Sequence, residues 1–191
     1  MATKYKTILL FGPPGCGKGT QGKVLGQLPN FLHCSSGDLF RGLDKQSELG
    51  KVFAEYSSKG LLVPDDFTVR LWQDHMERLV QAKKFDPQAG RLILDGIPRN
   101  VAQAKMMEDK IEPVQLFNLV TPDPQLLIQR LKRRALIEGR KDDANEDTIR
   151  RRLEVYEKET RPMLDFYQKV RVDIDGTTTP IQVLKDVLKY F

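Results

Sequence analysis

The chain is 191 residues long and 40% hydrophobic, so it can bury one full core and a small insertion but hardly two independent domains. Its net charge of +5, from 31 Lys and Arg against 26 Asp and Glu, is compatible with nucleic acid, an anionic surface or small polyanions. No apolar run approaches the ~20 residues that span a bilayer, and the first residues, MATKYKTILLF, lack a signal-peptide cleavage pattern. We therefore exclude a membrane protein and expect a cytoplasmic one without membrane partners.

Short β-type runs recur along the chain and are separated by segments with helical spacing. The runs are TILLFG at 7–12, FLHCSS at 31–36, RLILDG at 91–96, VQLFNLV at 114–120 and VRVDIDG at 170–176. Such alternation is typical of a parallel sheet covered by helices on both faces. The sequence therefore predicts an α/β fold, and the lack of repeats or low-complexity linkers predicts a single domain.

The first run ends in a glycine-rich loop, GPPGCGKGTQ, that leads into a helical pattern. Such a loop directs backbone N–H groups at one point at the positive end of a helix dipole, which makes an anion site. The phosphate-loop pattern G-x-x-x-x-G-K-[ST] fits from Gly12 through Lys18, but Gly19 stands where Ser or Thr should be, and Thr20 comes one residue late. We therefore expect magnesium to be held largely through water, with Asp95 nearby, and not by a hydroxyl of this loop.

The two cysteines, Cys16 and Cys34, do not form a C-x-x-C pair. We expect them to be free thiols in a reducing compartment, and we expect no structural zinc. The two histidines, His33 and His75, have no paired acid or nucleophile in the sequence and are expected to be structural.

Two motifs supply further arginines beside strand ends. SSGDLFR, 35–41, places Arg41 shortly after the Ser36 hydroxyl at the start of a helix. DGIPR, 95–99, follows a predicted strand, so it emerges at the same carboxyl edge of the sheet as the glycine-rich loop. Arg99 can fork onto a phosphate through two parallel N–H donors.

Helical spacing also predicts which side chains face the core. The expected stripes are Trp72, Met76, Leu79 and Val80 in the middle of the chain, and Ile181, Leu184 and Leu188 near its C-terminus.

The segment QRLKRRALIEGRKDD carries like charges side by side. In a helix over 123–138, Arg130 and Arg134 lie at i and i+4 and repel each other, so something anionic should compensate them. In the next helix, Ile149, Leu153 and Tyr156 mark the inward face. Arg152 lies near its edge, while Arg150 and Arg151 are expected in solvent.

One lysine and several arginines, with no catalytic triad, suit a reaction that needs charge neutralisation more than a nucleophile. Phosphoryl transfer is that reaction. Its barrier falls when donor and acceptor are aligned and cations clamp the transferring oxygens in a site closed to water.

With GPPGCGKGTQ, SSGDLFR, DGIPR, GRKDD and RRRLEVYEKET in this order, the chain closely resembles the adenylate kinase family of nucleoside monophosphate kinases over essentially its whole length. The resemblance implies a P-loop NTPase-like, five-stranded parallel sheet flanked by helices in a single domain, 1–191. It also implies a monophosphate-binding excursion at about 35–64 and a short lid at about 133–143, too short for the zinc-bearing form. Asp142 and Asp143 are then lid and hinge residues, and with Gly139 they belong to a loop whose ordering phosphate can drive.

The resemblance also implies roles for individual residues in Mg-dependent transfer from ATP to AMP. The implied ATP-binding residues are Gly15, Cys16, Gly17, Lys18, Gly19, Thr20, Arg130, Arg134 and Thr178. The implied AMP-binding residues are Ser36, Arg41, Leu61, Leu62, Val63, Gly96, Ile97, Pro98, Arg99, Gln103, Arg140 and Arg152. The implied catalytic residues are Lys18, Arg99, Arg134, Arg140 and Arg152, with Asp95 on the metal through water.

Two alternatives stay open. Ser36 and the Gln103 amide favour AMP as acceptor, whereas Asn100, directly after DGIPR, is a feature of the UMP/CMP kinases. The pI near 9.2 and the KRR and RRR clusters also allow a basic nucleic-acid-binding P-loop module, although the aromatic residues fall in apolar stripes. We favour an AMP kinase that is a monomer and binds no nucleic acid.

Overall fold

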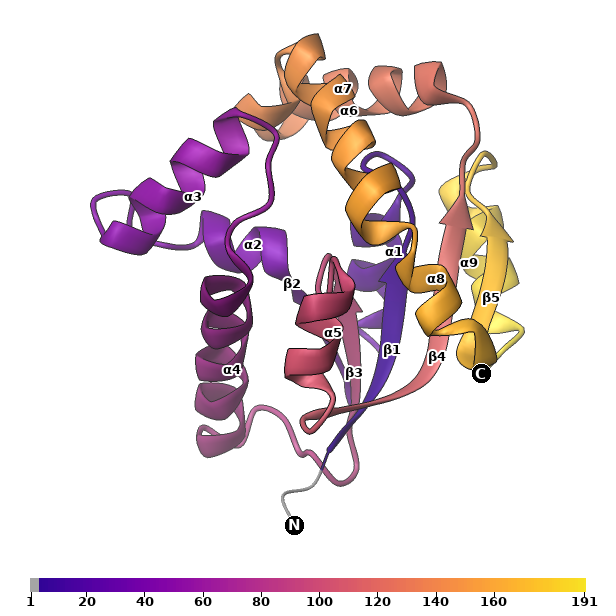
Figure 1. The fold of residues 1–191 in the computed structure, drawn as a ribbon. Coiled ribbons are helices and arrows are strands. Elements are labelled where there is room, and N and C mark those ends of the chain that lie inside the picture. Colours follow the sequence, from indigo (N-terminus) through magenta and orange to yellow (C-terminus); the bar gives the residue numbers. More distant parts are fainter. Residues whose placement is uncertain (1–3) are drawn as a thin grey trace.

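A computed structural model describes residues 4–191. Its centre is a parallel sheet of five strands in the order β2-β3-β1-β4-β5 (Figure 1). The strands are β1 (Tyr5–Phe11), β2 (Phe31–Ser35), β3 (Arg91–Asp95), β4 (Ile111–Val120) and β5 (Arg171–Asp175). All four strand pairs are parallel, so the predicted five-stranded α/β fold is confirmed.

One strand differs from its prediction at the amino end. β4 begins at Ile111, three residues before the predicted run, and continues through Pro113. The register against β1 shifts between Thr7 and Ile8, where Thr7 pairs with Pro113 and Ile8 with Gln115. Because proline cannot donate a ladder hydrogen bond, it is found in strands at such irregular positions. For the same reason, the sequence pattern did not predict a strand across Pro113.

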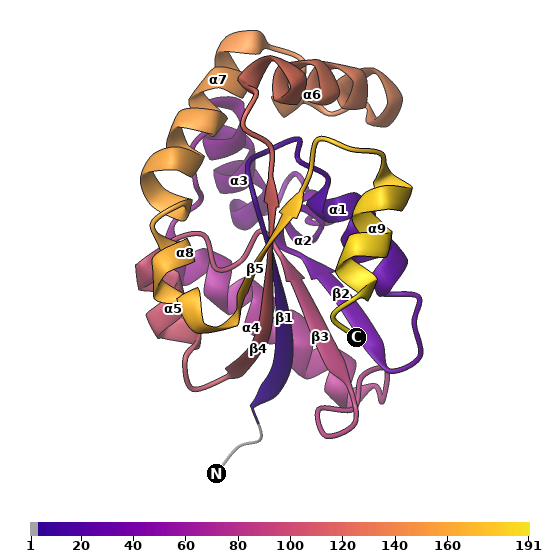
Figure 2. The same ribbon diagram turned by 90° about the vertical axis from the view of Figure 1, so that its right-hand side faces the viewer.

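Helices cover both faces of the sheet. The helical elements are α1 (Lys18–Leu25), α2 (Ser36–Arg41), α3 (Glu48–Ser58), α4 (Asp65–Gln81), α5 (Val101–Met107), α6 (Pro124–Glu138), η1 (Lys141–Asp143), α7 (Glu146–Val155), η2 (Tyr156–Thr160), α8 (Met163–Phe166), η3 (Gln168–Val170) and α9 (Pro180–Leu188). Figure 2 shows α4, α5 and α8 on one face, α1 and α9 on the other, and α6 across the carboxyl edge of the strands. Between residues 4 and 191, no helix is long and apolar enough to cross a membrane.

Alternate residues of the central strands build a separate core on each face. Leu9 and Phe11 of β1 pack in the cluster that holds Trp72, whereas Ile8 and Leu10 pack in the cluster of α1 and α9. A strand buried on both faces reads as a continuous apolar run, which is why TILLF shows no alternation. The sheet is thus packed on both faces, and the loops that follow its strands extend from its carboxyl edge.

The two predicted helical stripes have different outcomes. Trp72 and Met76 are each 1% exposed, with Leu79 and Val80 packed beside them, so that stripe is confirmed. The stripe at the C-terminus is wrong, because Ile181 and Leu188 are 69% and 43% exposed, and only Leu184 packs against the core. In α9 the buried residues are Val183 and Val187. Thr179 caps this helix and Pro180 begins it, and the helix packs against α1 and β5 through the face that carries Val183 and Val187.

This corrected phase gives a stability prediction. We expect Val187→Ala to lower the free energy of unfolding by about 1–3 kcal/mol, because it removes buried methyl groups and leaves a cavity. We expect Ile181→Ala on the same helix to change it by less than about 0.5 kcal/mol. Urea denaturation of the two variants measures the difference, and an equal loss in both would contradict the assigned phase.

Candidate active site

A cavity of about 580 Å³ lies at the carboxyl edge of the sheet. It is bounded by the loop after β1, by α2, by the loop after β3, by α6 and by α7. The predicted site residues that line it are Gly15, Cys16, Gly17, Lys18, Gly19, Thr20, Ser36, Arg41, Leu61, Leu62, Val63, Asp95, Gly96, Pro98, Arg99, Gln103, Arg130, Arg134, Arg140, Arg152 and Thr178. Ile97 is the exception, since its fully buried side chain belongs to the hydrophobic core.

The loop between β1 and α1 has the backbone that its glycines predict. Gly12, Gly15 and Gly17 all have positive φ, at 132°, 88° and 107°. A Cβ at Gly12 would lie 2.6 Å from Cys16 Sγ and 2.7 Å from the Leu119 carbonyl oxygen. The loop therefore closes tightly onto the strand, and its N–H groups at the start of α1 can point into the cavity.

Lys18 is held at the mouth of this loop. Its ammonium donates to the carbonyl oxygens of Gly12, at 2.6 Å, and Pro13, at 3.0 Å. These partners are neutral acceptors, so the positive charge is positioned without being neutralised. A phosphate entering the loop can therefore pair with it.

Asp95 ends β3 directly opposite the loop. Asp95 as a whole is 8% exposed, and a Cβ at Gly19 would lie 3.5 Å from Asp95 Oδ2. Burial alone would raise the pKa of Asp95, but His33, 3.9 Å away, and the cations Lys18 and Arg99 outweigh burial and lower it. Hydrated Mg²⁺ takes one or two carboxylates together with substrate phosphates, so this ionised carboxylate beside the glycine loop suits it.

Arg99 is held between the loop after β3 and the start of α2. Its Nε donates to the Gly96 carbonyl at 2.7 Å, and its Nη2 donates to the Ser36 hydroxyl at 3.5 Å. Burial, and then repulsion from Arg152, lowers the pKa of Arg99 to about 10, which still leaves it charged at neutral pH. A buried guanidinium that is repelled by another arginine gains from a bound anion.

Two arginines on different elements share one buried carboxylate. Asp143, which is fully buried, accepts a hydrogen bond from Arg134 Nε at 2.6 Å and another from Arg152 Nη1. Burial disfavours the charged form of Arg134, but the hydrogen bond that its Nε donates to Asp143, together with the charge of that carboxylate, outweighs burial and raises the pKa of the guanidinium. Asp143 therefore compensates the repulsion expected along α6.

The remaining predicted arginines also have partners. Arg130 donates to the carbonyl oxygens of Gly176, at 2.7 Å, and Thr177, at 3.0 Å, which ties α6 to the loop that holds Thr178. Arg41 pairs with Asp38 at 2.6 Å, and Arg140 pairs with Glu138 at 2.6 Å. These acidic partners occupy the guanidinium groups that a phosphate would otherwise bind.

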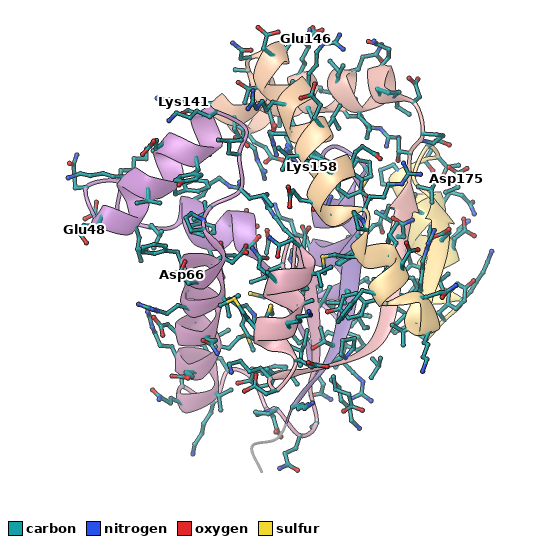
Figure 3. All side chains as sticks on the ribbon, in the orientation of Figure 1. Glu48, Asp66, Lys141, Glu146, Lys158 and Asp175 are labelled. Atoms are coloured by element: carbon teal, nitrogen blue, oxygen red, sulfur yellow. The ribbon has the colours of Figure 1, made fainter. Side chains whose placement is uncertain are left out.

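The arginines of α7 lie as predicted. Arg152 is partly buried, whereas Arg150 and Arg151 are exposed. Arg150 pairs with Glu146 on the outer side of the helix, where Figure 3 labels Glu146 at the far end from the sheet. Of the three consecutive arginines, only Arg152 serves the cavity.

Comparison with known proteins finds a family whose model matches most of the chain. The family model described as adenylate kinase matches residues 10–172, which include the glycine loop, Asp95 and every arginine of the cavity.

The chain belongs to the adenylate kinase family.

Relatives named adenylate kinase cover nearly the whole chain. One from Cyanothece sp. is 43% identical, covering 95% of this chain and 96% of the relative. One from Corynebacterium urealyticum is 38% identical, covering 91% and 93%, and one from Porphyromonas gingivalis is 41% identical, covering 90% and 88%. The predicted membership of the adenylate kinase family is confirmed.

Asn100 is the residue that indicated the UMP/CMP kinases in the sequence. In the structure its side chain makes hydrogen bonds within the protein. Its Oδ1 accepts a hydrogen bond from the backbone N–H of Gln103 at 2.8 Å and so caps α5. Its Nδ2 donates to Asp65 at 2.9 Å. Because both ends of its amide are used inside the protein, Asn100 gives no support to pyrimidine recognition.

Several residues around the cavity were not predicted. Phe40 and Phe53 stack with ring centroids 5.1 Å apart, and Thr160 donates to the Arg99 carbonyl at 2.7 Å. Phe40 belongs to the SSGDLFR motif, but no sequence pattern indicates that it stacks on Phe53 or that Thr160 lies beside Arg99. Asp143 was predicted as a hinge residue, and its pairing with two arginines was not foreseen.

Proposed function

We propose that the chain is an adenylate kinase, which transfers the terminal phosphoryl group of magnesium ATP reversibly to AMP and yields two molecules of ADP. The observation that carries this proposal is the cavity in which a glycine loop with Lys18 faces a group of converging arginines. Phosphoryl transfer needs two aligned anionic substrates and cations around the transferring oxygens.

The cavity has a donor side and an acceptor side. We assign the ATP phosphates to the glycine loop, residues 15–20, with Arg130 and Arg134 on the donor nucleotide and the transferring group, and Thr178 near the donor base. We assign the AMP phosphate to Arg41 and Arg99, and its base to the pocket of Ser36, Gln103 and the 61–63 backbone. Arg140 and Arg152 close over the phosphates, and Asp95 orients the magnesium of the bound ATP through water.

We propose that residues 35–64 form the monophosphate-binding excursion and residues 133–143 the lid. Both carry arginines whose present partners are carboxylates: Arg41 with Asp38, and Arg134 with Asp143. A bound phosphate offers these guanidinium groups a stronger partner, so binding can drive closure. The two segments already approach each other, since η1 lies beside α3, where Figure 3 labels Lys141.

AMP is the acceptor that the named relatives and the site favour over UMP or CMP. We expect a monomer of the cytoplasm that binds neither nucleic acid nor membranes, since the arginines of α6 and α7 that line the cavity are engaged in the phosphate site. Filter binding across salt concentrations tests the nucleic-acid alternative. Tight, salt-sensitive binding of single-stranded polynucleotide would support that alternative.

The proposed activity is tested by coupled ADP release with magnesium ATP and a panel of acceptors: AMP, dAMP, CMP, UMP and GMP. We expect selective turnover of AMP. Preference for UMP or CMP would place the protein with the neighbouring branch, and absence of turnover with every acceptor would refute the kinase assignment.

A further inference from the structure

A carboxylate outside the cavity wall ties two helices together behind the proposed base pocket. Asp65, the first residue of α4, accepts a hydrogen bond from Gln103 Nε2 at 2.7 Å on the same oxygen that accepts from Asn100 Nδ2. Both donors belong to the start of α5 or its cap, and α4 and α5 lie side by side (Figure 1). Asp65 is not among the residues that line the cavity, whereas Gln103 is.

These bonds leave the Gln103 amide only one orientation. Its Oε1 accepts from the backbone N–H of Arg99 at 2.8 Å, and its Nε2 donates to Asp65. A backbone N–H can only donate and a carboxylate can only accept. Turning the amide by 180° would therefore set its N–H against the N–H of Arg99 and its oxygen against the carboxylate of Asp65. Gln103 is 1% exposed, so water cannot compensate for such a mismatch.

The fixed amide matches only one kind of base edge. Each end of the amide keeps one unused hydrogen-bonding position, an acceptor at Oε1 and a donor at Nε2. On its Watson–Crick edge, adenine offers the complement, an amino donor beside a ring-nitrogen acceptor, whereas the 6-keto purines offer a carbonyl acceptor beside an N–H donor on that edge. A locked amide therefore accepts adenine and rejects hypoxanthine, while an amide free to turn could pair with either.

We propose that Asp65 is a positioning residue that sets the purine selectivity of the acceptor site by holding the Gln103 amide in the adenine-reading orientation. This inference rests on the proposed function, specifically on Gln103 reading the acceptor base. Asn100 assists by donating to the same carboxylate oxygen while it caps α5.

A purely structural role for Asp65 as an acidic residue at a helix N-terminus is the competing explanation. Asp66 stands in the same first turn of α4, is exposed, and can interact with the helix dipole equally well (Figure 3). Only Asp65 reaches the amides of Gln103 and Asn100. The neighbouring carboxylate thus provides a matched control for charge and helix position.

The test compares AMP with inosine monophosphate, its 6-keto counterpart, as acceptors in the full-length enzyme. For Asp65→Ala we expect the ratio of kcat/KM for AMP to that for inosine monophosphate to fall at least about tenfold, the effect of one hydrogen bond to a buried partner. Asp65→Asn keeps an acceptor oxygen and is expected to retain most of the selectivity. Asp66→Ala should leave the ratio unchanged, and the KM for ATP should stay within about twofold in all three variants.

An unchanged ratio in Asp65→Ala, or an equal fall in Asp66→Ala, would overturn the proposal. If Asp65→Ala does not fold, Asp65→Ser keeps a polar residue in the first turn of α4, and its shorter side chain no longer reaches Gln103. Gln103→Met separates this inference from the function on which it rests. Loss of selectivity in Gln103→Met without loss in Asp65→Ala would refute the positioning role alone, whereas unchanged selectivity in Gln103→Met would refute Gln103 as the base reader.

Discussion

Lys18→Met should lower kcat for ADP formation by about 10²–10³-fold, the usual effect of removing one preorganised charge from a transition state. The substitution keeps an apolar side chain of similar length but removes the ammonium, which donates hydrogen bonds to the Gly12 and Pro13 carbonyl oxygens. Because the glycine loop still supplies its backbone N–H groups, ATP binding should weaken much less than turnover falls.

Two measurements separate loss of chemistry from loss of structure in this variant. Single-turnover kinetics with magnesium ATP and AMP should show the fall in rate, while thermal denaturation should show a folded protein. Lys185→Met removes a lysine from the exposed side of α9 and should keep wild-type turnover. A Lys18→Met enzyme with a turnover within tenfold of the wild type would show that Lys18 does not act on the transferring group.

The parts of the site that could be predicted from the sequence are those in which the chemistry lies within one short segment. Gly12, Gly15 and Gly17 must adopt positive φ for the loop to close, so their spacing alone predicts the anion site. Arg152 could be separated from Arg150 and Arg151 because helical periodicity orients each residue once its neighbours are known.

The parts that could not be predicted depend on contacts between distant segments. The carboxylate of Asp65 lies 38 residues from Gln103, and nothing in either segment indicates that they meet. The buried face of α9 likewise depends on packing against α1 and β5, which covers Val183 and leaves Ile181 exposed. Local periodicity lists candidate faces, and tertiary packing selects among them.

Arg99→Met should lower kcat/KM for AMP by about 10²–10³-fold, because it removes a guanidinium that we assign to the AMP phosphate. The KM for ATP should change by less than about threefold, since the glycine loop and Lys18 are untouched. Arg150→Met, which removes an exposed arginine paired with Glu146, should leave all kinetic constants near those of the wild type.

The same substitution should not destabilise the protein, although it removes a buried charge with two hydrogen bonds. Burial and the repulsion from Arg152 lower the pKa of Arg99, so the folded state disfavours its charged form. After substitution the Gly96 carbonyl still accepts from the Ser36 hydroxyl at 2.6 Å, so it is not left unpaired. We therefore expect an unchanged or higher Tm in Arg99→Met, together with the loss of activity. A lower Tm would show that Arg99 supports the fold, and it would remove the reason for reading its cluster of positive charge as an anion site.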